Sequence, residues 1–224
     1  RTKASYQAAN EIVSSLGIEV KYVAGYSASY RWKGCEIEHH QRLFDLHNPF
    51  LKKYLRRLVL DKQVQNNTIE VFGTSLVVPA PILQILQVNA HILKHLLSFG
   101  VGMRQLCDAA RLYAVYKAAL DGDFLKNIYS KTNILKWVML LHRLLVDYIG
   151  LPKADLPFSL PEGVKAHWMM EEIWKGGDFG FYNEQASGSR AKQRLWSNFK
   201  KYFPYAPMEA ISFPLVHFYS GVTK

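Results

Sequence analysis

The feature that most constrains the fold is a change in the hydrophobic pattern of the chain at Pro81. Before Pro81, short apolar runs are separated by glycine turns at Lys33-Gly34 and near Gly73, a pattern typical of β-hairpins. After Pro81 only helical patterns follow, and glycine and proline separate them. The sequence therefore predicts an α+β fold, with a small mixed sheet in a domain spanning 1–80 and an all-α helical domain spanning 81–224.

The individual elements can be placed from the same patterns. We expect a first helix whose apolar residues recur at helical spacing: Ala8, Ala9, Ile12, Val13 and Leu16, with Gly17 ending it. Next we expect a strand over 18–24, a hairpin over 27–43, a helix over 48–62 and a second hairpin over 67–80. Helices are then expected over 81–99, 102–119, from 122, and over 133–150, 163–177, 190–203 and 207–219, with a flexible polar stretch over 178–194.

The charge balance bears on the class of partner. The formal net charge is +10, which favours anionic partners such as nucleotides or polyphosphates. A globular domain with a basic surface explains the same balance. Nucleic acid is less well supported, because no known binding motif is present and the basic residues do not alternate with aromatic ones. No apolar run reaches the roughly 18 residues of a membrane span. We expect no membrane association, and Cys35 and Cys107 fit reduced thiols in the cytoplasm.

The second arm of the first hairpin carries a polar face. Alternation along a strand places Glu36, Glu38, His40 and Arg42 on one side and Cys35, Ile37 and His39 on the other. Two interpretations are open for a face with two carboxylates, an imidazole and a guanidinium. It is either a solvated face or a catalytic one.

A second candidate lies at the junction of the first two long helices. His91 and His95 are one helical turn apart, which suggests either a zinc site or histidines that hydrogen-bond within a helical interface. Gly100 and Gly102 predict a tight connection between antiparallel helices. Arg104 and Asp108 are also one turn apart and can pair. They form either a structural brace or an anion-binding pair, in which Asp108 orients Arg104 near His95.

Four stretches of the chain resemble a known family. They are KGCEIEHHQR (33–42), ILKHLLSFGVGMRQLCD (92–108), LVDYIGLP (145–152) and GGDFGFYN (176–183). In this order they resemble a large family of bacterial proteins classed as uncharacterised nucleotidyltransferases, of the polymerase-beta-like superfamily. The resemblance extends over nearly the whole chain, and residues 1–80 would then be a partial nucleotidyltransferase-like α/β domain.

The resemblance implies a metal-dependent transfer reaction. Family members hold Mg²⁺ and a nucleotide triphosphate with two carboxylates in a D-x-D arrangement, and a third carboxylate comes from a later strand. Glu38 matches the third carboxylate, and His40 and Arg42 match the polar residues that follow it. The resemblance also places Arg104 in the cleft, where it offers a guanidinium to an anion. No D-x-D pair precedes the first helix, so we expect this chain to be the C-terminal portion of a longer protein.

Two functions from different classes follow from these observations. The first is that the full protein transfers a nucleoside monophosphate from a nucleotide triphosphate to an unknown acceptor, the present chain alone being inactive. The second is a non-enzymatic nucleotidyltransferase-like module that binds an anionic ligand, a partner protein or nucleic acid. The proposed catalytic residues are Glu38, His40 and Arg42, the proposed metal ligand is Glu38, and the proposed ligand-binding residues are His95, Arg104 and Asp108.

Overall fold

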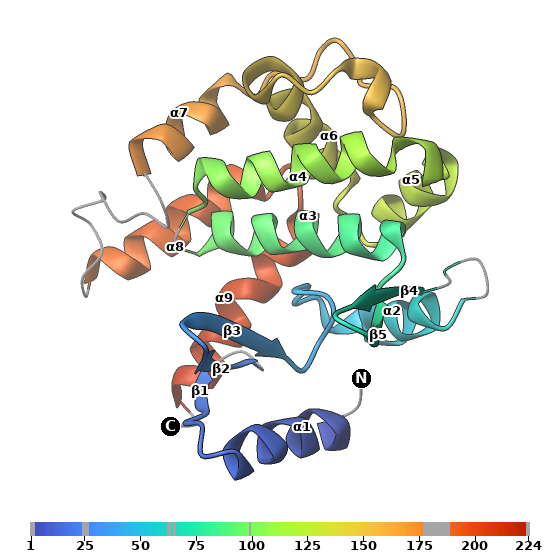
Figure 1. Ribbon diagram of the computed structural model, residues 1–224. Helices are drawn as coiled ribbons and strands as arrows, with labels where there is room; N and C mark the ends of the chain where they lie inside the picture. Colours follow the sequence, from blue (N-terminus) through green and yellow to red (C-terminus); the bar gives the residue numbers. More distant parts are fainter. Residues whose placement is uncertain are drawn as a thin grey trace.

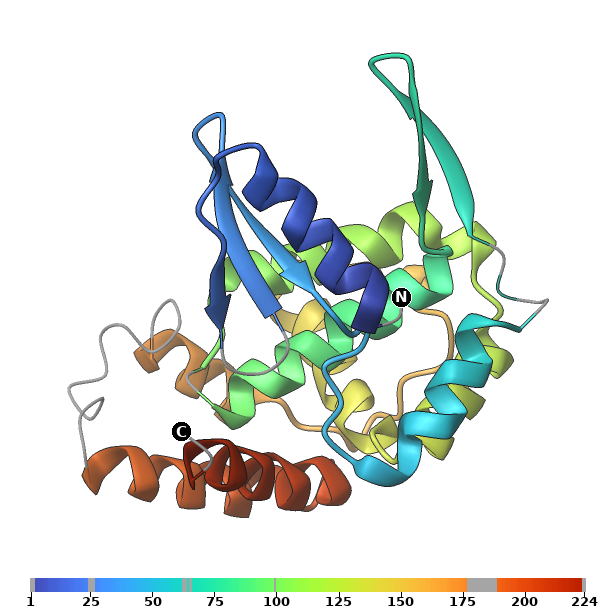
Figure 2. The ribbon, with the colours of Figure 1, turned by 90° about the horizontal axis from the view of Figure 1, so that it is seen from below.

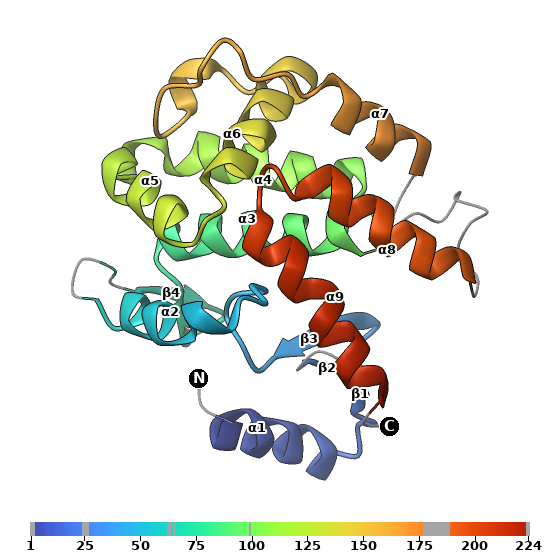
Figure 3. The same ribbon diagram turned by 180° about the vertical axis from the view of Figure 1, so that it is seen from behind.

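A computed structural model of the chain describes residues 3–23, 27–61, 64, 66–98, 100–176 and 189–222. It confirms the α+β class, with small sheets in the first third and helices throughout the rest. Figure 1 shows the helices α3 to α8 stacked on one side of the sheet β1-β2-β3, and α1 on the other side. The helix α9 runs from the helical part down to this sheet, as Figure 3 shows from behind.

The elements before Pro81 follow the predicted order. They are α1 (Lys3–Ser15), β1 (Lys21–Val23), β2 (Ser27–Trp32), β3 (Cys35–His40), a 3₁₀ turn η1 (Pro49–Leu51), α2 (Lys52–Val59), β4 (Asn67–Val71) and β5 (Thr74–Val78). Within the described residues every strand pair is antiparallel, whereas a mixed sheet was expected. Antiparallel pairing is the physical consequence of short hairpin connections, because parallel strands need a longer crossover.

Both predicted hairpin turns are confirmed. Lys33 and Gly34 have positive φ angles of 48° and 83°, and Phe72 and Gly73 have φ angles of 49° and 74°. Positive φ at both central residues is the geometry of a tight two-residue hairpin turn, and glycine adopts it without steric cost. In Figure 2 the β4–β5 hairpin projects away from the helices.

The strand β3 has a different neighbour on each face. On the face of His39, the imidazole Nδ1 lies 2.8 Å from Asn10 Oδ1 of α1, and the His39 ring contacts Tyr6 at 4.9 Å between centroids. Asn10 and Tyr6 are the buried residues of α1. The opposite face of β3, which carries Glu38 and His40, is turned toward α3.

The helices after Pro81 also follow the predicted order. They are α3 (Pro81–Leu97), α4 (Met103–Tyr116), a 3₁₀ turn η2 (Lys117–Ala119), α5 (Gly122–Lys131), α6 (Leu135–Leu144), a π-helical turn η3 (Leu145–Ile149), a 3₁₀ turn η4 (Lys153–Asp155), α7 (His167–Gly176), α8 (Ser189–Tyr202) and α9 (Pro207–Val222). The predicted long helix over 133–150 therefore changes to π geometry in its last turn, and Gly150 ends it with a φ angle of +83°. The helix expected from 163 begins at His167. Most of the stretch predicted to be flexible, 178–188, lies outside the described residues.

The connection between α3 and α4 is as tight as predicted. Gly100 adopts a φ angle of +102°, and its amide donates to the His95 carbonyl at 2.7 Å, which closes the end of α3. The two helices then run antiparallel and pack against each other (Figure 1). Both helices bury apolar side chains, among them Leu86, Leu93 and Leu106, and Asn89 of α3 donates to the Tyr113 hydroxyl of α4 at 2.6 Å. One apolar cluster extends from Phe44 to Phe213 and includes side chains from both predicted domains. Among the helices of the described residues, none is long and apolar enough to cross a membrane.

Candidate functional site

Polar side chains from β3, from the loop after it and from α3 form one cluster. We call it the β3–α3 cluster, and its members are Glu38, His40, Asp45, His91, Lys94 and His95. The structure therefore joins three of the six predicted site residues, Glu38, His40 and His95. The other three members come from the segment that follows β3 and from the exposed side of α3.

Glu38 and His40 form the more exposed side of the cluster. They lie two residues apart on β3 and so share a face, which brings His40 Nε2 within 3.3 Å of Glu38 Oε2. The hydrogen bond with His40 lowers the pKa of Glu38, and the positive charges of Lys94 and His91 act in the same direction. The hydrogen bond with Glu38 in turn raises the pKa of His40. Glu38 is thus an ionised carboxylate whose side chain is 51% exposed.

Asp45 forms the more enclosed side of the cluster. Its Oδ2 atom lies 2.7 Å from His91 Nδ1 and 3.4 Å from Lys94 Nζ. Burial alone would raise the pKa of Asp45, but the hydrogen bond from His91 and the charge of Lys94 outweigh burial and hold the pKa well below its usual value. Asp45 therefore stays ionised at neutral pH, and its charge is already compensated by two partners.

The hydrogen-bond chain continues from His91 to His95. Their Nε2 atoms lie 2.9 Å apart, so the two histidines hydrogen-bond as expected, although His91 faces β3 and the loop of Asp45 instead of another helix. Because ionised Asp45 can only accept, His91 Nδ1 carries a proton, and a single further proton lies between the two Nε2 atoms. Burial and the nearby charges of His91 and Lys94 lower the pKa of His95 to about 4, so His95 is neutral at physiological pH. The chain Asp45–His91–His95 can therefore pass one proton between its two imidazoles.

A distant carboxylate fixes the loop that carries Asp45. Glu209, in the first turn of α9, is 1% exposed and accepts from the backbone amides of His47 at 2.7 Å and Asn48 at 3.0 Å. The side chains on either side of Asp45, Phe44 and Leu46, are buried in the apolar core. The loop is thus held from two sides, and Asp45 has a fixed position relative to α3.

The cluster does not form a complete metal site by itself. Within the described parts of the chain, no group of three or more His, Cys, Asp or Glu side chains is arranged to hold a metal ion. Mg²⁺ requires oxygen ligands, and Glu38 supplies one ionised carboxylate. The Asp45 carboxylate already contacts His91 and Lys94. The Nε2 atoms of His91 and His95 bond to each other, so the zinc interpretation finds no support in their geometry.

The remaining three predicted residues are Arg42, Arg104 and Asp108. The strand β3 ends at His40, so the expectation that Arg42 shares its strand face is wrong, and Arg42 lies in the exposed start of the following loop. Arg104 Nε lies 4.0 Å from Asp108 Oδ2, which is too long for the expected hydrogen bond. The side chains of Arg104 and Asp108 are 90% and 61% exposed, so the pair is a surface ion pair on α4. A ligand-binding role for these three residues stays a prediction.

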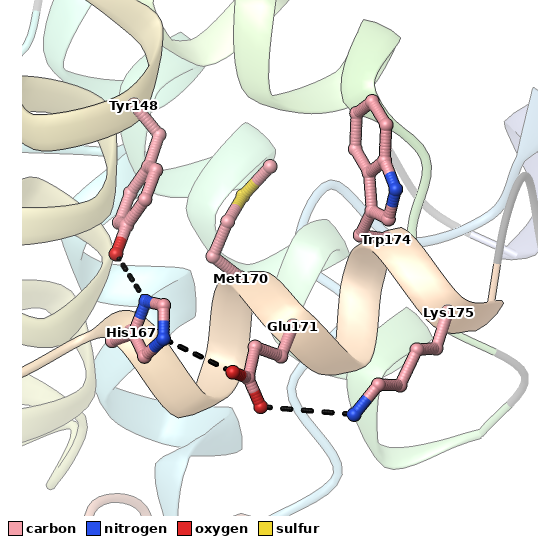
Figure 4. Close-up of a pocket in the computed structure, with 6 residues that line it drawn as sticks. All are labelled: Tyr148, His167, Met170, Glu171, Trp174 and Lys175. Atoms are coloured by element: carbon pink, nitrogen blue, oxygen red, sulfur yellow. Dashed lines mark hydrogen bonds and ion pairs between the residues drawn. The ribbon is translucent and has the colours of Figure 1, made fainter.

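A second group of polar and aromatic side chains surrounds a surface hollow of about 220 Å³ on α7. Figure 4 shows Tyr148 bonded to His167, His167 to Glu171 and Glu171 to Lys175, with Trp174 at the other end. These side chains are largely exposed, and His167, Glu171 and Lys175 are spaced one turn apart on a single helix. Such solvated pairs contribute little to the stability of the fold. The β3–α3 cluster is the more enclosed of the two sites.

The match to a protein family covers the β3–α3 cluster. Residues 2–150 match the family described as uncharacterised nucleotidyltransferase, which is more than half of the chain. The chain therefore belongs to this nucleotidyltransferase family. The matched range includes α2 and both halves of the cluster and ends before α7 begins. Searches of curated proteins and of solved structures gave no match.

Proposed function

We propose that the β3–α3 cluster is part of an active site that transfers a nucleoside monophosphate from a nucleotide triphosphate to an acceptor. The observation that carries the proposal is the state of Glu38, an ionised and half-exposed carboxylate that His40 contacts at 3.3 Å. Membership of a nucleotidyltransferase family supports the reaction class. A carboxylate in this state can bind a cation without first losing a proton.

The proposed cation is Mg²⁺, with Glu38 as one of its oxygen ligands. When bound, Mg²⁺ neutralises the charge that develops on the phosphate oxygens. The remaining ligands would come from water, from the nucleotide and from carboxylates outside the described residues. His40, the neighbour of Glu38 on β3, would then orient the carboxylate through the 3.3 Å contact.

The positive groups of the cluster suit a triphosphate. Lys94 reaches the cluster from α3, and its side chain is 25% exposed, so its ammonium group retains access to a ligand. A raised pKa keeps His40 protonated over a wider pH range than an ordinary histidine. Fixed positive charges of this kind stabilise the negative charge that grows on the leaving pyrophosphate.

We further propose that Asp45, His91 and His95 position the polar face of α3 beside Glu38 and do not act as the general base. Asp45 holds His91 in one orientation through the 2.7 Å hydrogen bond to Nδ1. The Nε2 atom of His91 bonds to His95 Nε2 at 2.9 Å and His95 Nδ1 is buried, so neither ring offers a nitrogen to an acceptor hydroxyl. The lowered pKa of His95, about 4, also makes this imidazole a weak base.

The alternative is a non-enzymatic module that keeps the fold and binds an anionic ligand. One observation favours it, namely that the described residues do not complete a metal site. The two functions differ in turnover. A binding module retains nucleotide affinity but releases no pyrophosphate.

The test is pyrophosphate release from each of the four nucleotide triphosphates with Mg²⁺, in the intact protein. Glu38→Gln should reduce release by about 100-fold or more, because the amide cannot provide the charge of a metal ligand. Glu36→Gln is the matched control, since Glu36 lies two residues earlier on the same face of β3 and is also exposed. Unchanged release in Glu38→Gln, with the thermal unfolding curves of both variants like that of the wild type, would contradict the proposal.

A further inference from the structure

The second helix of the chain presents a strongly basic surface. Helix α2 follows the loop of Asp45 along the chain. Four exposed cations line a surface hollow of about 420 Å³ on it: Lys52, Lys53, Arg56 and Arg57. Their spacing places two adjacent cations on each of two successive helical turns.

None of these four cations forms an ion pair with another described side chain. Eleven ion pairs join described side chains, and none involves Lys52, Lys53, Arg56 or Arg57. No acidic residue lines the hollow. Four cations in one concave surface attract an anion with several negative groups, and two guanidinium groups can bind phosphate oxygens in a bidentate manner.

An aromatic side chain lines the same hollow. Phe50 precedes α2 and is 80% exposed, although a large apolar side chain gains free energy by burial. Asn48 fixes this part of the backbone by accepting from the Phe50 amide at 3.1 Å. An exposed aromatic ring beside a row of cations is the arrangement with which proteins bind single-stranded nucleic acid, since bases stack on the ring and phosphates meet the cations.

The apolar side of α2 argues against a membrane surface as the partner. An interfacial helix inserts its apolar face into the lipid. In α2 that face points inward, with Leu51 and Leu58 buried and Leu55 packed against the core. The surface that is free to meet a partner carries four cations and, at its two ends, the exposed apolar side chains Phe50 and Leu60.

We propose that the α2 hollow binds the phosphate backbone of single-stranded nucleic acid, with one base stacked on Phe50. The inference deepens the proposed function and rests on it in one respect, because a polynucleotide bound on α2 would be the acceptor. Binding itself requires neither Mg²⁺ nor a nucleotide triphosphate. It can therefore be measured separately from transfer.

The test is fluorescence anisotropy of a labelled oligouridylate of about 12 nucleotides, with EDTA present and without nucleotide triphosphate. If the four cations each meet a phosphate, affinity should fall about 50-fold between about 50 and 200 mM salt, from a slope of about 0.7 per contact. Replacing the four cations together by glutamine should weaken binding by more than about 10-fold and flatten this salt dependence. Phe50→Ala should weaken binding by about fivefold or more. Neither change touches the core, and thermal unfolding checks that the fold is kept.

The matched control removes four exposed cations elsewhere and so has the same net charge. Its substitutions are Arg111→Gln, Lys136→Gln, Lys153→Gln and Lys165→Gln, and it should bind the oligonucleotide like the wild type. Equal losses in both quadruple variants would overturn the proposal, because binding would then follow net charge alone. So would binding to vesicles of phosphatidylcholine and phosphatidylserine without binding to the oligonucleotide. Glu38→Gln should bind normally, which separates failure of this inference from failure of the proposed transfer reaction.

Discussion

The buried histidine His142 predicts a specific loss of stability in acid. His142 lies on α6, is 0% exposed, and packs against the rings of Tyr113 and Phe158 at centroid distances of 4.8 and 5.0 Å. Neither of its ring nitrogens has a hydrogen-bond partner within the described residues. Burial lowers the pKa of His142 to about 3, so the folded protein keeps this imidazole neutral in mild acid.

The magnitude follows from the difference in proton binding between the two states. In the unfolded chain the pKa is about 6.5, so the unfolded state binds a proton at about pH 5 and the folded state does not. The free energy of unfolding therefore falls as the pH is lowered below about 6.5, and His142 accounts for about 2 kcal/mol of the loss at pH 5. This loss of about 2 kcal/mol does not depend on the pKa in the folded state as long as that pKa lies below about 4.

The perturbation is His142→Phe, which keeps an aromatic ring in the same site and removes the titrating group. Urea denaturation at about pH 7.5 and pH 5 gives two free energies of unfolding for each protein. The wild type should lose about 2 kcal/mol more than the variant between these pH values, and any packing change cancels in the comparison. His167→Phe, at a largely exposed histidine, is the control. Equal losses in wild type and His142→Phe would refute the reasoning.

Two further predictions concern the residues that hold the β3–α3 cluster in place. Asp45→Asn should lower the free energy of unfolding by about 1–2 kcal/mol at neutral pH, because an amide keeps an acceptor for His91 but loses the charge opposite Lys94. The lowered pKa of Asp45 gives the sign of the pH effect. The stability that its charge contributes is present above about pH 4 and is lost as the pH falls through the pKa of the folded state. Urea denaturation in stronger acid should therefore give similar free energies of unfolding for the variant and the wild type. Glu209→Gln should cost about 1–3 kcal/mol by thermal or urea unfolding, because one of two buried backbone amides loses its acceptor. A change below about 0.5 kcal/mol would show that this carboxylate does not hold the loop.

The elements of the fold could largely be predicted from local patterns. The glycine turns of both hairpins and the break between α3 and α4 are local requirements on φ, so a few residues determine them. The first helix shows where this reasoning stops. Ile12 and Leu16 share a face as predicted, yet both are 63% exposed, and the buried residues are Tyr6 and Asn10. Periodicity tells which side chains share a face, but the tertiary contacts decide which face is covered.

The candidate site was predicted only in part, for a related reason. Glu38 and His40 lie two apart on a strand, so alternation alone places them together. Asp45 lies in irregular backbone and meets His91 across 46 residues, and Glu209 reaches the same loop across 162 residues. No spacing rule encodes such contacts. The one local sign was the pattern Phe44-Asp45-Leu46, in which two buried apolar side chains flank a carboxylate.

The central claim is that Glu38 joins a magnesium–nucleotide complex to this protein, and the most direct test is the Mg²⁺ dependence of nucleotide triphosphate binding. Calorimetry with the intact protein gives the affinity with and without Mg²⁺ and needs no acceptor. For the wild type and for Glu36→Gln, Mg²⁺ should strengthen binding by about 10-fold or more, whereas Glu38→Gln should lose most of this gain. Glu38→Gln should still unfold close to the wild-type temperature, because its carboxylate is half exposed. An undiminished Mg²⁺ effect in Glu38→Gln would contradict the account.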